Sequence, residues 1–266
     1  MTAAVLIAAA ILFGLAIGSF VNVVVWRVPR GESVVRPPSA CPRCGHPIRA
    51  RDNVPVISWL VLRGRCRDCG EPISPRYPLV EAGCGALFGL AAWFTGPAWD
   101  LPAVLYLAGV GVALALIDLD THRLPDALVL PSYVAMAALL TLASWNPTGT
   151  SDWGALARAG IGAAAMFVVY FALVLVYPAG MGFGDVKLAG VLGMVLGWYG
   201  WSALAVGFFL PFVLGGLFAL GLIAVRKATR KSGVPFGPWM VLGAGLGIVL
   251  GGHLVRWYFD ALGASV

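Results

Sequence analysis

Long apolar runs alternate with short polar segments along the whole chain. A helix needs about 20 apolar residues to cross a hydrocarbon core roughly 30 Å thick. One uncharged stretch, Leu188–Val225, has 38 residues and is too long for a single span, so we expect two helices there with a turn near residues 198–201. The other runs are Thr2–Trp26, Leu79–Phe94, Leu101–Ile117, Ala127–Ser144, Gly160–Tyr177 and Pro238–Val255. The pattern predicts an all-α polytopic membrane protein with about eight transmembrane helices.

The first run, residues 1–26, is interpreted as a transmembrane helix rather than as a cleaved signal peptide. Its beginning is not basic, it is longer than the apolar core of a typical signal, and no small-x-small cleavage pattern stands out near its end. We therefore expect three parts: this first helix, a polar loop at residues 27–78 that is the only sizeable soluble piece, and a seven-helix membrane core at 79–266.

Composition supports the membrane assignment. Hydrophobic residues make up 60% of the chain, charged residues only 11%, and the mean hydropathy is +0.88. A soluble domain carries roughly a quarter of its residues as charges. A soluble fold is therefore excluded.

The basic residues gather on one side of the predicted topology. Alternate loops of an eight-helix protein fall on one face, and 16 Lys and Arg residues lie in the loops of one face, against Arg158 and Arg256 on the other. Positive residues are retained in the cytoplasm during insertion. We therefore expect the inner (cytoplasmic) membrane, with the loop 27–78 in the cytoplasm and both termini outside. The net charge of +6 follows from this signal and from attraction to anionic lipid, and does not require a nucleic acid.

The loop 27–78 contains two copies of the pattern CxxCGxPI, with 21 residues between the pairs. The four thiols can close a tetrahedron around Zn²⁺, and a set filled by four Cys leaves no open position for water, so the metal would be structural. A disulfide is disfavoured in a reducing cytoplasm. His46 is not needed as a ligand, and Cys84 is expected to be a small buried hydrophobe. The predicted ligands are Cys41, Cys44, Cys66 and Cys69.

Two carboxylates at membrane boundaries are the candidate catalytic groups. Asp118 closes the third span, Asp185 opens the sixth, and counting crossings places both at the same depth on the cytoplasmic face despite 66 intervening residues. A carboxylate at such depth is costly and points to function. Asp120 and Asp126 share a polar turn and are expected to mark the interface, and Glu81 also lies at a boundary.

Two neighbouring carboxylates cannot both ionise and so share one proton, which leaves one base to activate water and one acid to polarise a peptide carbonyl. The pair titrates as a unit, so neither role is assigned to one residue. Glycines before Asp185 allow close approach by a neighbouring helix or by an extended substrate. There is no HExxH and no GxSxG pattern in the chain, which disfavours a zinc protease or a serine hydrolase.

The segment Gly182-Phe-Gly-Asp185 resembles the GxGD motif of intramembrane-type aspartic proteases. An ordered set of further motifs, from about residue 14 to residue 240, is similar to the bacterial type IV prepilin peptidases, also called leader peptidase/N-methyltransferases. The set comprises Gly18-Ser-Phe-Val-Asn-Val, the paired CxxC loop, Arg76-Tyr-Pro-Leu-Val-Glu81, Ile117-Asp-Leu-Asp120, Leu124-Pro-Asp126, Gly182-Phe-Gly-Asp-Val-Lys187 and Pro235-Phe-Gly-Pro238.

The resemblance implies an aspartic endopeptidase with a second activity. Such enzymes cleave basic leaders from prepilins and pseudopilins of pilus and secretion systems, on the cytoplasmic side, after a Gly that precedes a hydrophobic helix. By resemblance the catalytic pair is Asp118 and Asp185, with Gly182, Gly184 and Lys187 as supporting motif residues. Members with the tetracysteine loop also methylate the new N-terminal amine using S-adenosylmethionine. The short segment 27–40 lacks an insertion that some relatives carry, which bears on methyl transfer rather than on proteolysis.

The residues themselves support the protease more directly than the transferase. No glycine-rich βαβ signature is present, and the loop is too small for a Rossmann domain, so a methyl donor would have to lie between the loop and the helices. Asn53 and the loop arginines are unranked candidates to bind it. The particular pilin, the pilus or secretion system and the oligomeric state stay open at this point.

Two other classes of protein would explain part of this pattern. A secondary transporter could use paired Asp residues as a proton relay, but these acids lie at helix ends rather than at the midplane, and the two halves show no repeat. A membrane-anchored zinc scaffold would leave Asp118 and Asp185 unexplained. The peptidase hypothesis accounts for both features.

Overall fold

The computed structural model describes residues 2–178, 180–226 and 233–263, and its regular structure is helical. The eight long helices are α1 (Ala3–Arg27), α3 (Arg76–Thr95), α4 (Leu101–Thr121), α5 (Asp126–Trp145), α6 (Trp153–Val176), α7 (Phe183–Tyr199), α8 (Trp201–Ala224) and α9 (Gly237–Ala261). Short turns of helix are η1 (Val28–Arg30), η2 (Ala50–Asp52) and α2 (Ile57–Val61). The described residues form two isolated β-bridges and no strand. The predicted all-α fold is confirmed.

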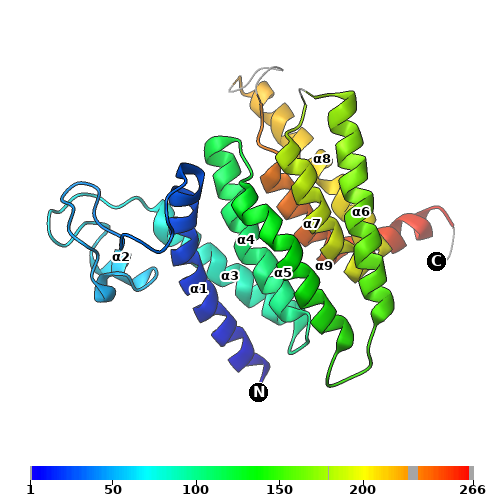
Figure 1. Ribbon diagram of the computed structural model, residues 1–266, viewed down its shortest axis with the longest axis horizontal. Coiled ribbons are helices and arrows are strands. Elements are labelled where there is room, and N and C mark those ends of the chain that lie inside the picture. Colours follow the sequence, from blue (N-terminus) through cyan, green and yellow to red (C-terminus); the bar gives the residue numbers. More distant parts are fainter. Residues whose placement is uncertain (1, 179, 227–232, 264–266) are drawn as a thin grey trace. The chain divides into compact units, whose positions relative to one another are not determined.

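Seven of the long helices are apolar and long enough to cross a membrane. The eighth, α7, has 17 residues and packs against α5, α6, α8 and α9 (Figure 1). The predicted turn in the long uncharged stretch is also present: α7 ends at Tyr199, α8 begins at Trp201, and Gly200 between them has a φ of 133° that L side chains rarely adopt. Most side chains of α7 are buried, so this helix forms the centre of its unit.

The chain forms two compact units, Met1–Ala113 and Leu114–Val266, whose boundary falls within α4. In the first unit α1 lies along α3 (Figure 1). Glycines make this approach possible: a Cβ at Gly18 would lie 2.6 Å from the Cα of Glu81, and one at Gly14 would lie 2.7 Å from the carbonyl oxygen of Cys84. The segment between η1 and α3 carries the four predicted zinc ligands.

The second unit is built on two close helix pairs, α6 with α7 and α8 with α9. A Cβ at Gly162 of α6 would lie 3.0 Å from the Cα of Gly197 of α7 and still closer to the carbonyl oxygen of Gly193. Small residues let helices in a membrane approach until their backbones touch, where dispersion and weak polar contacts replace the hydrophobic effect as the driving force. The glycines therefore fix α7, which carries Asp185, against α6.

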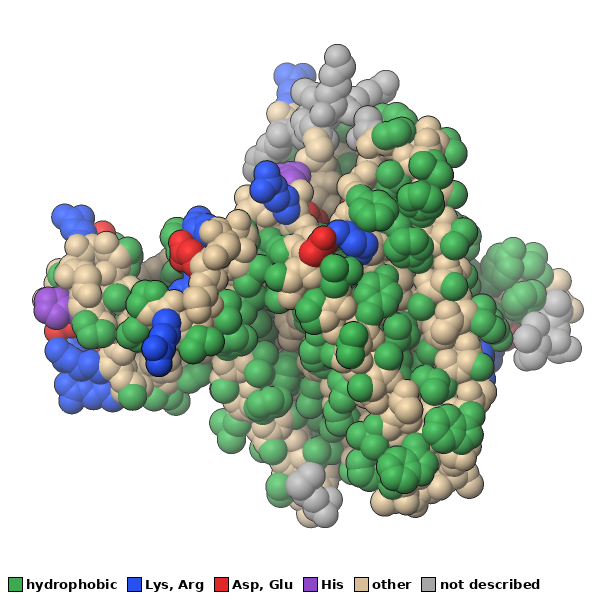
Figure 2. All heavy atoms as spheres, viewed as in Figure 1, with side chains coloured by type: hydrophobic (Ala, Val, Ile, Leu, Met, Phe, Trp, Pro, Cys, Tyr) green, Lys and Arg blue, Asp and Glu red, His purple; other side chains and the backbone are tan. Residues whose placement is uncertain are grey.

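Hydrophobic side chains cover most of the helical surface visible in Figure 2, while the charged side chains on that face gather on the cysteine-bearing segment and at helix ends. Many large apolar side chains are exposed, among them Val134, Val168, Leu175, Phe209 and Leu217. A soluble protein does not expose so continuous an apolar surface. The surface is that of a protein solvated by lipid.

Candidate active site and cysteine centre

Asp185 is positioned by the first turn of α7. Its Oδ2 accepts a hydrogen bond from the backbone N–H of Gly182 at 3.0 Å, and its own N–H donates to the Gly182 carbonyl at 3.0 Å. The side chain therefore closes back on the residue that caps the helix, where the unpaired N–H groups of the first turn favour negative charge. Only 8% of Asp185 is exposed.

Asp118 lies in the last turn of α4 and is 5% exposed. Its Oδ2 accepts a hydrogen bond from the backbone N–H of Gly237, the first residue of α9, at 2.9 Å. A Cβ at Gly237 would meet that same oxygen at 2.9 Å, so only glycine lets the backbone come this close. His122, one turn further along, interacts electrostatically with Asp118. Sequence reasoning noted Gly237 only as part of a motif and did not foresee this contact.

The structure brings the two carboxylates together. Asp118 and Asp185 interact electrostatically within the second unit, although 66 residues separate them in the sequence. Leu124, just after α4, packs against a glycine beside each carboxylate: its Cβ lies 3.0 Å from where a Cβ of Gly184 would be, and its Cδ2 lies 3.2 Å from that of Gly237. The absence of a side chain at Gly184 leaves room for Leu124. A neighbouring segment of the chain therefore approaches this glycine closely.

Lys187 and Asp126 form an ion pair next to the start of α7. The Lys187 ammonium also lies over the ring of Phe183, 5.4 Å from its centroid, and the Lys187 carbonyl accepts a hydrogen bond from the Tyr133 hydroxyl at 2.7 Å. These contacts tie α5 to α7. Asp126, expected only to mark the interface, is the partner of the motif lysine, whereas Asp120 is exposed.

The four predicted thiols form one cluster. The sulfur atoms of Cys41, Cys44, Cys66 and Cys69 all lie within 4.8 Å of one another, and the Cys41 and Cys69 sulfurs are 3.8 Å apart. A zinc ion holding four thiolates at about 2.3 Å separates its sulfurs by about 3.8 Å, the edge of a regular tetrahedron of that radius. The donor set and its size fit Zn²⁺.

The two halves of the cluster repeat the same turn. The N–H of Gly45 donates to the Cys41 carbonyl at 2.9 Å, and the N–H of Gly70 donates to the Cys66 carbonyl at 3.0 Å. Both glycines have a φ of 71°, which explains why glycine follows each CxxC. Hydrogen bonds from the backbone N–H groups of residues 44 and 43 lower the pKa of the Cys41 thiol to about 7, whereas desolvation and the neighbouring thiols raise the pKa of Cys44 and Cys69.

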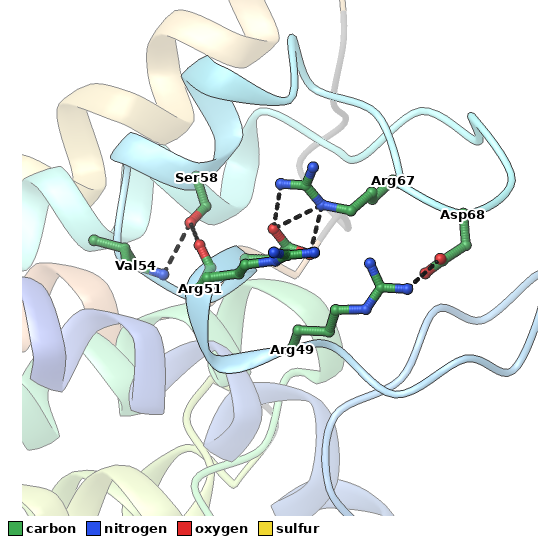
Figure 3. A network of polar contacts seen from close by, with 7 residues as sticks. Arg49, Arg51, Val54, Ser58, Arg67 and Asp68 are labelled. Carbon is green, nitrogen blue, oxygen red and sulfur yellow. Dashed lines mark hydrogen bonds and ion pairs between the residues drawn. The ribbon is translucent and has the colours of Figure 1, made fainter.

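Arginines hold the rest of the loop in place (Figure 3). Arg67, within the second CxxC, makes a two-pronged ion pair with Asp52, at 2.9 Å from Nε to Oδ2 and 2.6 Å from Nη2 to Oδ1. Arg49 pairs with Asp68 at 2.8 Å. The Arg67 guanidinium lowers the pKa of the Asp52 carboxyl. Two arginines among the unranked cofactor candidates are therefore engaged within the loop itself.

Glu81 of α3 anchors the loop to the membrane helices. Its Oε2 accepts a hydrogen bond from the N–H of Val56 at 2.7 Å. Val56 has φ 62° and ψ −50°, and the N–H of Ile57 donates across it to the Pro55 carbonyl at 2.6 Å, which is a γ-turn of the rare, strained kind. A β-branched residue in this conformation persists only when its surroundings hold it. Sequence reasoning had placed Glu81 at a boundary without this partner.

Two buried carboxylates at helix ends, in an all-helical protein with a lipid-facing surface, are the arrangement expected of a membrane-embedded aspartic peptidase. The family models agree: residues 12–95 match the bacterial peptidase A24 N-terminal domain, and residues 105–220 match the type IV leader peptidase family. The chain belongs to the type IV leader peptidase family.

Three similar curated relatives carry the same name, "Prepilin leader peptidase/N-methyltransferase". The relative from Aeromonas salmonicida is 36% identical over 277 residues, covering 94% of this chain and 93% of its own length. The relative from Aeromonas hydrophila is 38% identical over 272 residues, covering 93% and 91%. The relative from Pseudomonas putida is 36% identical over 286 residues, covering 99% and 97%. No solved structure matches the chain.

Proposed function

We propose that this enzyme cleaves the leader peptides of type IV prepilins or pseudopilins after a glycine, using water activated by Asp118 and Asp185. The observation that carries the proposal is the pair of buried, mutually interacting carboxylates, each held by a single backbone N–H at the start of a helix, α7 for Asp185 and α9 for Asp118. Membership of the leader peptidase family supplies the substrate class.

The geometry suits an acid and base sharing one proton. Each carboxylate uses Oδ2 for its backbone donor, and within the described residues no hydrogen bond is made by the other oxygen of either group. The ionised partner takes a proton from water, the water oxygen attacks the scissile carbonyl carbon, and the protonated partner donates to the carbonyl oxygen. The tetrahedral diol then collapses as the C–N bond breaks: the carboxyl that took the proton from water donates it to the amine nitrogen, and the other carboxylate takes a proton from the diol, which restores the pair. The two roles belong to the pair rather than to either residue.

The cysteine centre is proposed to hold a structural zinc ion through Cys41, Cys44, Cys66 and Cys69. The matching turns, the 3.8 Å sulfur separation and the four-sulfur donor set support this. A fully thiolate-ligated ion fixes the loop rather than activating water. The loop 27–78, as a part separate from the first helix and from the core 79–266, is proposed to serve methyl transfer.

A second activity is proposed for the amine that cleavage releases. S-adenosylmethionine, when bound, supplies a methyl group from its sulfonium sulfur to the new N-terminal nitrogen. The shared name of the relatives favours this activity, and the four-cysteine loop is retained in full. The chain's own contribution is a rigid loop: Glu81 holds the strained Val56 turn, and the ion pairs of Arg67 and Arg49 fix the second cysteine turn.

We propose that the protein lies in the inner membrane with the peptidase site and the cysteine loop on the cytoplasmic side and both termini outside. The support is the count of 16 basic residues on one face against two on the other. This sidedness suits a substrate whose basic leader stays in the cytosol while its apolar helix waits in the membrane.

The test is cleavage of a purified prepilin by full-length enzyme in lipid vesicles, for Asp118→Asn and Asp185→Asn separately. Each variant should lose cleavage while inserting into the membrane at the wild-type level. Asp260→Asn, near the end of α9, is the matched control and should cleave normally. Retained cleavage in either site variant would contradict the dyad. Mass spectrometry of the mature pilin N-terminus, in the same samples with S-adenosylmethionine added, shows whether the amine gains a methyl group.

A further inference from the structure

Tyr170 of α6 carries a hydroxyl that the fold buries and does not use. The residue is fully buried, at 0% exposed, and its hydroxyl has no hydrogen-bond partner in the parts of the chain that the structure describes. Buried polar groups in native proteins nearly always have partners, and an unpaired one calls for an explanation such as a catalytic role. Among the described side chains only Arg158 contains another such buried atom, its Nε.

Aromatic side chains fix the Tyr170 ring. Its centroid lies 5.7 Å from those of Phe208 and Phe212 of α8, and 6.4 Å from that of Phe236, the residue before α9. Contacts of this kind hold a ring in one orientation. The hydroxyl is therefore fixed in a buried position among aromatic side chains.

The ring also lies near Asp185 and near the segment that holds Asp118. Phe236 directly precedes Gly237, whose N–H holds Asp118. The Tyr170 phenol interacts electrostatically with the Asp185 carboxylate without a hydrogen bond to it. Because the Tyr170 hydroxyl lies near the dyad but makes no hydrogen bond to it, this hydroxyl can donate a hydrogen bond to a third group.

We propose that Tyr170 is a further catalytic residue, whose hydroxyl donates a hydrogen bond to the carbonyl oxygen of the scissile peptide bond. The inference rests on the proposed peptidase function. The oxygen of that carbonyl gains negative charge as water attacks, and a fixed donor in a buried site of low dielectric stabilises such charge far better than a donor in bulk water. The hydroxyl is fully buried in this structure, so the substrate reaches it only by displacing neighbouring side chains, and the scissile carbonyl then supplies the acceptor that the described residues lack.

The test is Tyr170→Phe in the full-length enzyme in lipid vesicles, with prepilin as substrate. This change keeps the ring and removes one oxygen. We expect kcat to fall about 10²-fold, as on removal of one oxyanion donor, with little change in KM. The melting temperature should stay the same or rise, because the variant no longer buries an unpaired hydroxyl. Loss of activity together with retained or raised stability is what a merely structural tyrosine would not produce.

Two tyrosines provide matched controls. Tyr133→Phe removes a hydroxyl that is paired with the Lys187 carbonyl, so its melting temperature should fall. Tyr258→Phe changes an exposed residue near the end of α9 and should leave both kcat and stability unchanged.

Three results would overturn the inference: wild-type kcat in Tyr170→Phe, a raised KM with unchanged kcat, or a lowered melting temperature with unchanged kcat. With cleavage by wild type and Tyr258→Phe established, each of these rejects the role of Tyr170 and leaves the proposed function standing. Cleavage by Asp118→Asn or Asp185→Asn rejects the dyad, and the role of Tyr170 with it.

Discussion

Replacing Gly237 by alanine tests whether the position of Asp118 sets the rate. The new Cβ would lie 2.9 Å from Oδ2 of Asp118 and 3.2 Å from Cδ2 of Leu124, whereas ordinary contacts begin at 3.4 Å. The carboxylate must therefore move by about 0.5 Å or more, which reaches the tolerance of roughly 0.5 Å within which catalytic groups have to be held. Because a misplacement of about 1 Å can cost about 10²-fold in rate, we expect kcat to fall about 10- to 100-fold.

Gly245→Ala is the matched control, since it lies on the same helix and its Cβ would meet nothing within 4 Å. It should cleave at the wild-type rate and be more stable by about 0.5–1 kcal/mol, the usual gain of alanine over glycine inside a helix. The assay is prepilin cleavage under saturating substrate in lipid vesicles, with thermal unfolding measured in the same vesicles. Equal kcat for Gly237→Ala and Gly245→Ala, with both proteins folded, would refute the reasoning that the Gly237 contact fixes the position of Asp118.

Three further outcomes are expected. Gly162→Ala should lower the free energy of unfolding by about 1–3 kcal/mol because it forces α6 from α7, while Gly160→Ala, which meets nothing, should not, and equal melting curves would contradict this packing. Cys66→Ser should reduce bound zinc, measured by elemental analysis, from about one ion per chain to well below one. Asp52→Asn should speed hydrogen exchange in the loop. Arg67 lowers the pKa of Asp52, so the pair stabilises the loop above the ordinary value of about 3.9 and the difference from wild type should vanish as the pH falls through the lowered pKa.

The sequence was sufficient for the helices and for the meeting of the two acids. Apolar runs end where charges begin, because a charge inside hydrocarbon is costly, so the ends of α4 and the start of α7 could be located within a few residues. Counting crossings then predicted that Asp118 and Asp185 share a depth, and the structure brings them into electrostatic contact. Their catalytic roles stay a prediction until the variants are tested.

The supports of the site could not be predicted in the same way. The donor to Asp118 is a backbone N–H, which every residue but proline has, and it comes from 119 residues away in the sequence. Leu124 resembles any other apolar residue until its contacts with the two glycine positions are seen. The Val56 turn held by Glu81 could not be predicted either, since nothing about a valine in the sequence indicates a positive φ.

In the cysteine loop, too, the sequence pattern predicted the local turns but not the partners of the charged side chains. The spacing of the two CxxC pairs predicted the cluster of sulfurs, because each pair with its following glycine forms a local turn. The basic residues of the loop were read as a topological signal, which requires only their charge. Their pairing with Asp52 and Asp68 depends on how the two cysteine turns face each other, and a count of charges carries no information on that.

The manner in which the dyad is held bears on its chemistry. Within the described residues neither Asp118 nor Asp185 pairs with a lysine or arginine, and the nearby Lys187 is taken by Asp126. The first turns of α7 and α9 supply the N–H donors instead, and a helix N-terminus favours a nearby negative charge by about 0.3–1 kcal/mol, up to about 2 in partly buried sites. A salt bridge would bind the charge of one carboxylate more firmly and hold the proton on the other. In the proposed mechanism, two weaker donors, one for each acid, would stabilise the single negative charge wherever it resides and so leave the shared proton free to move between the carboxylates during each turnover.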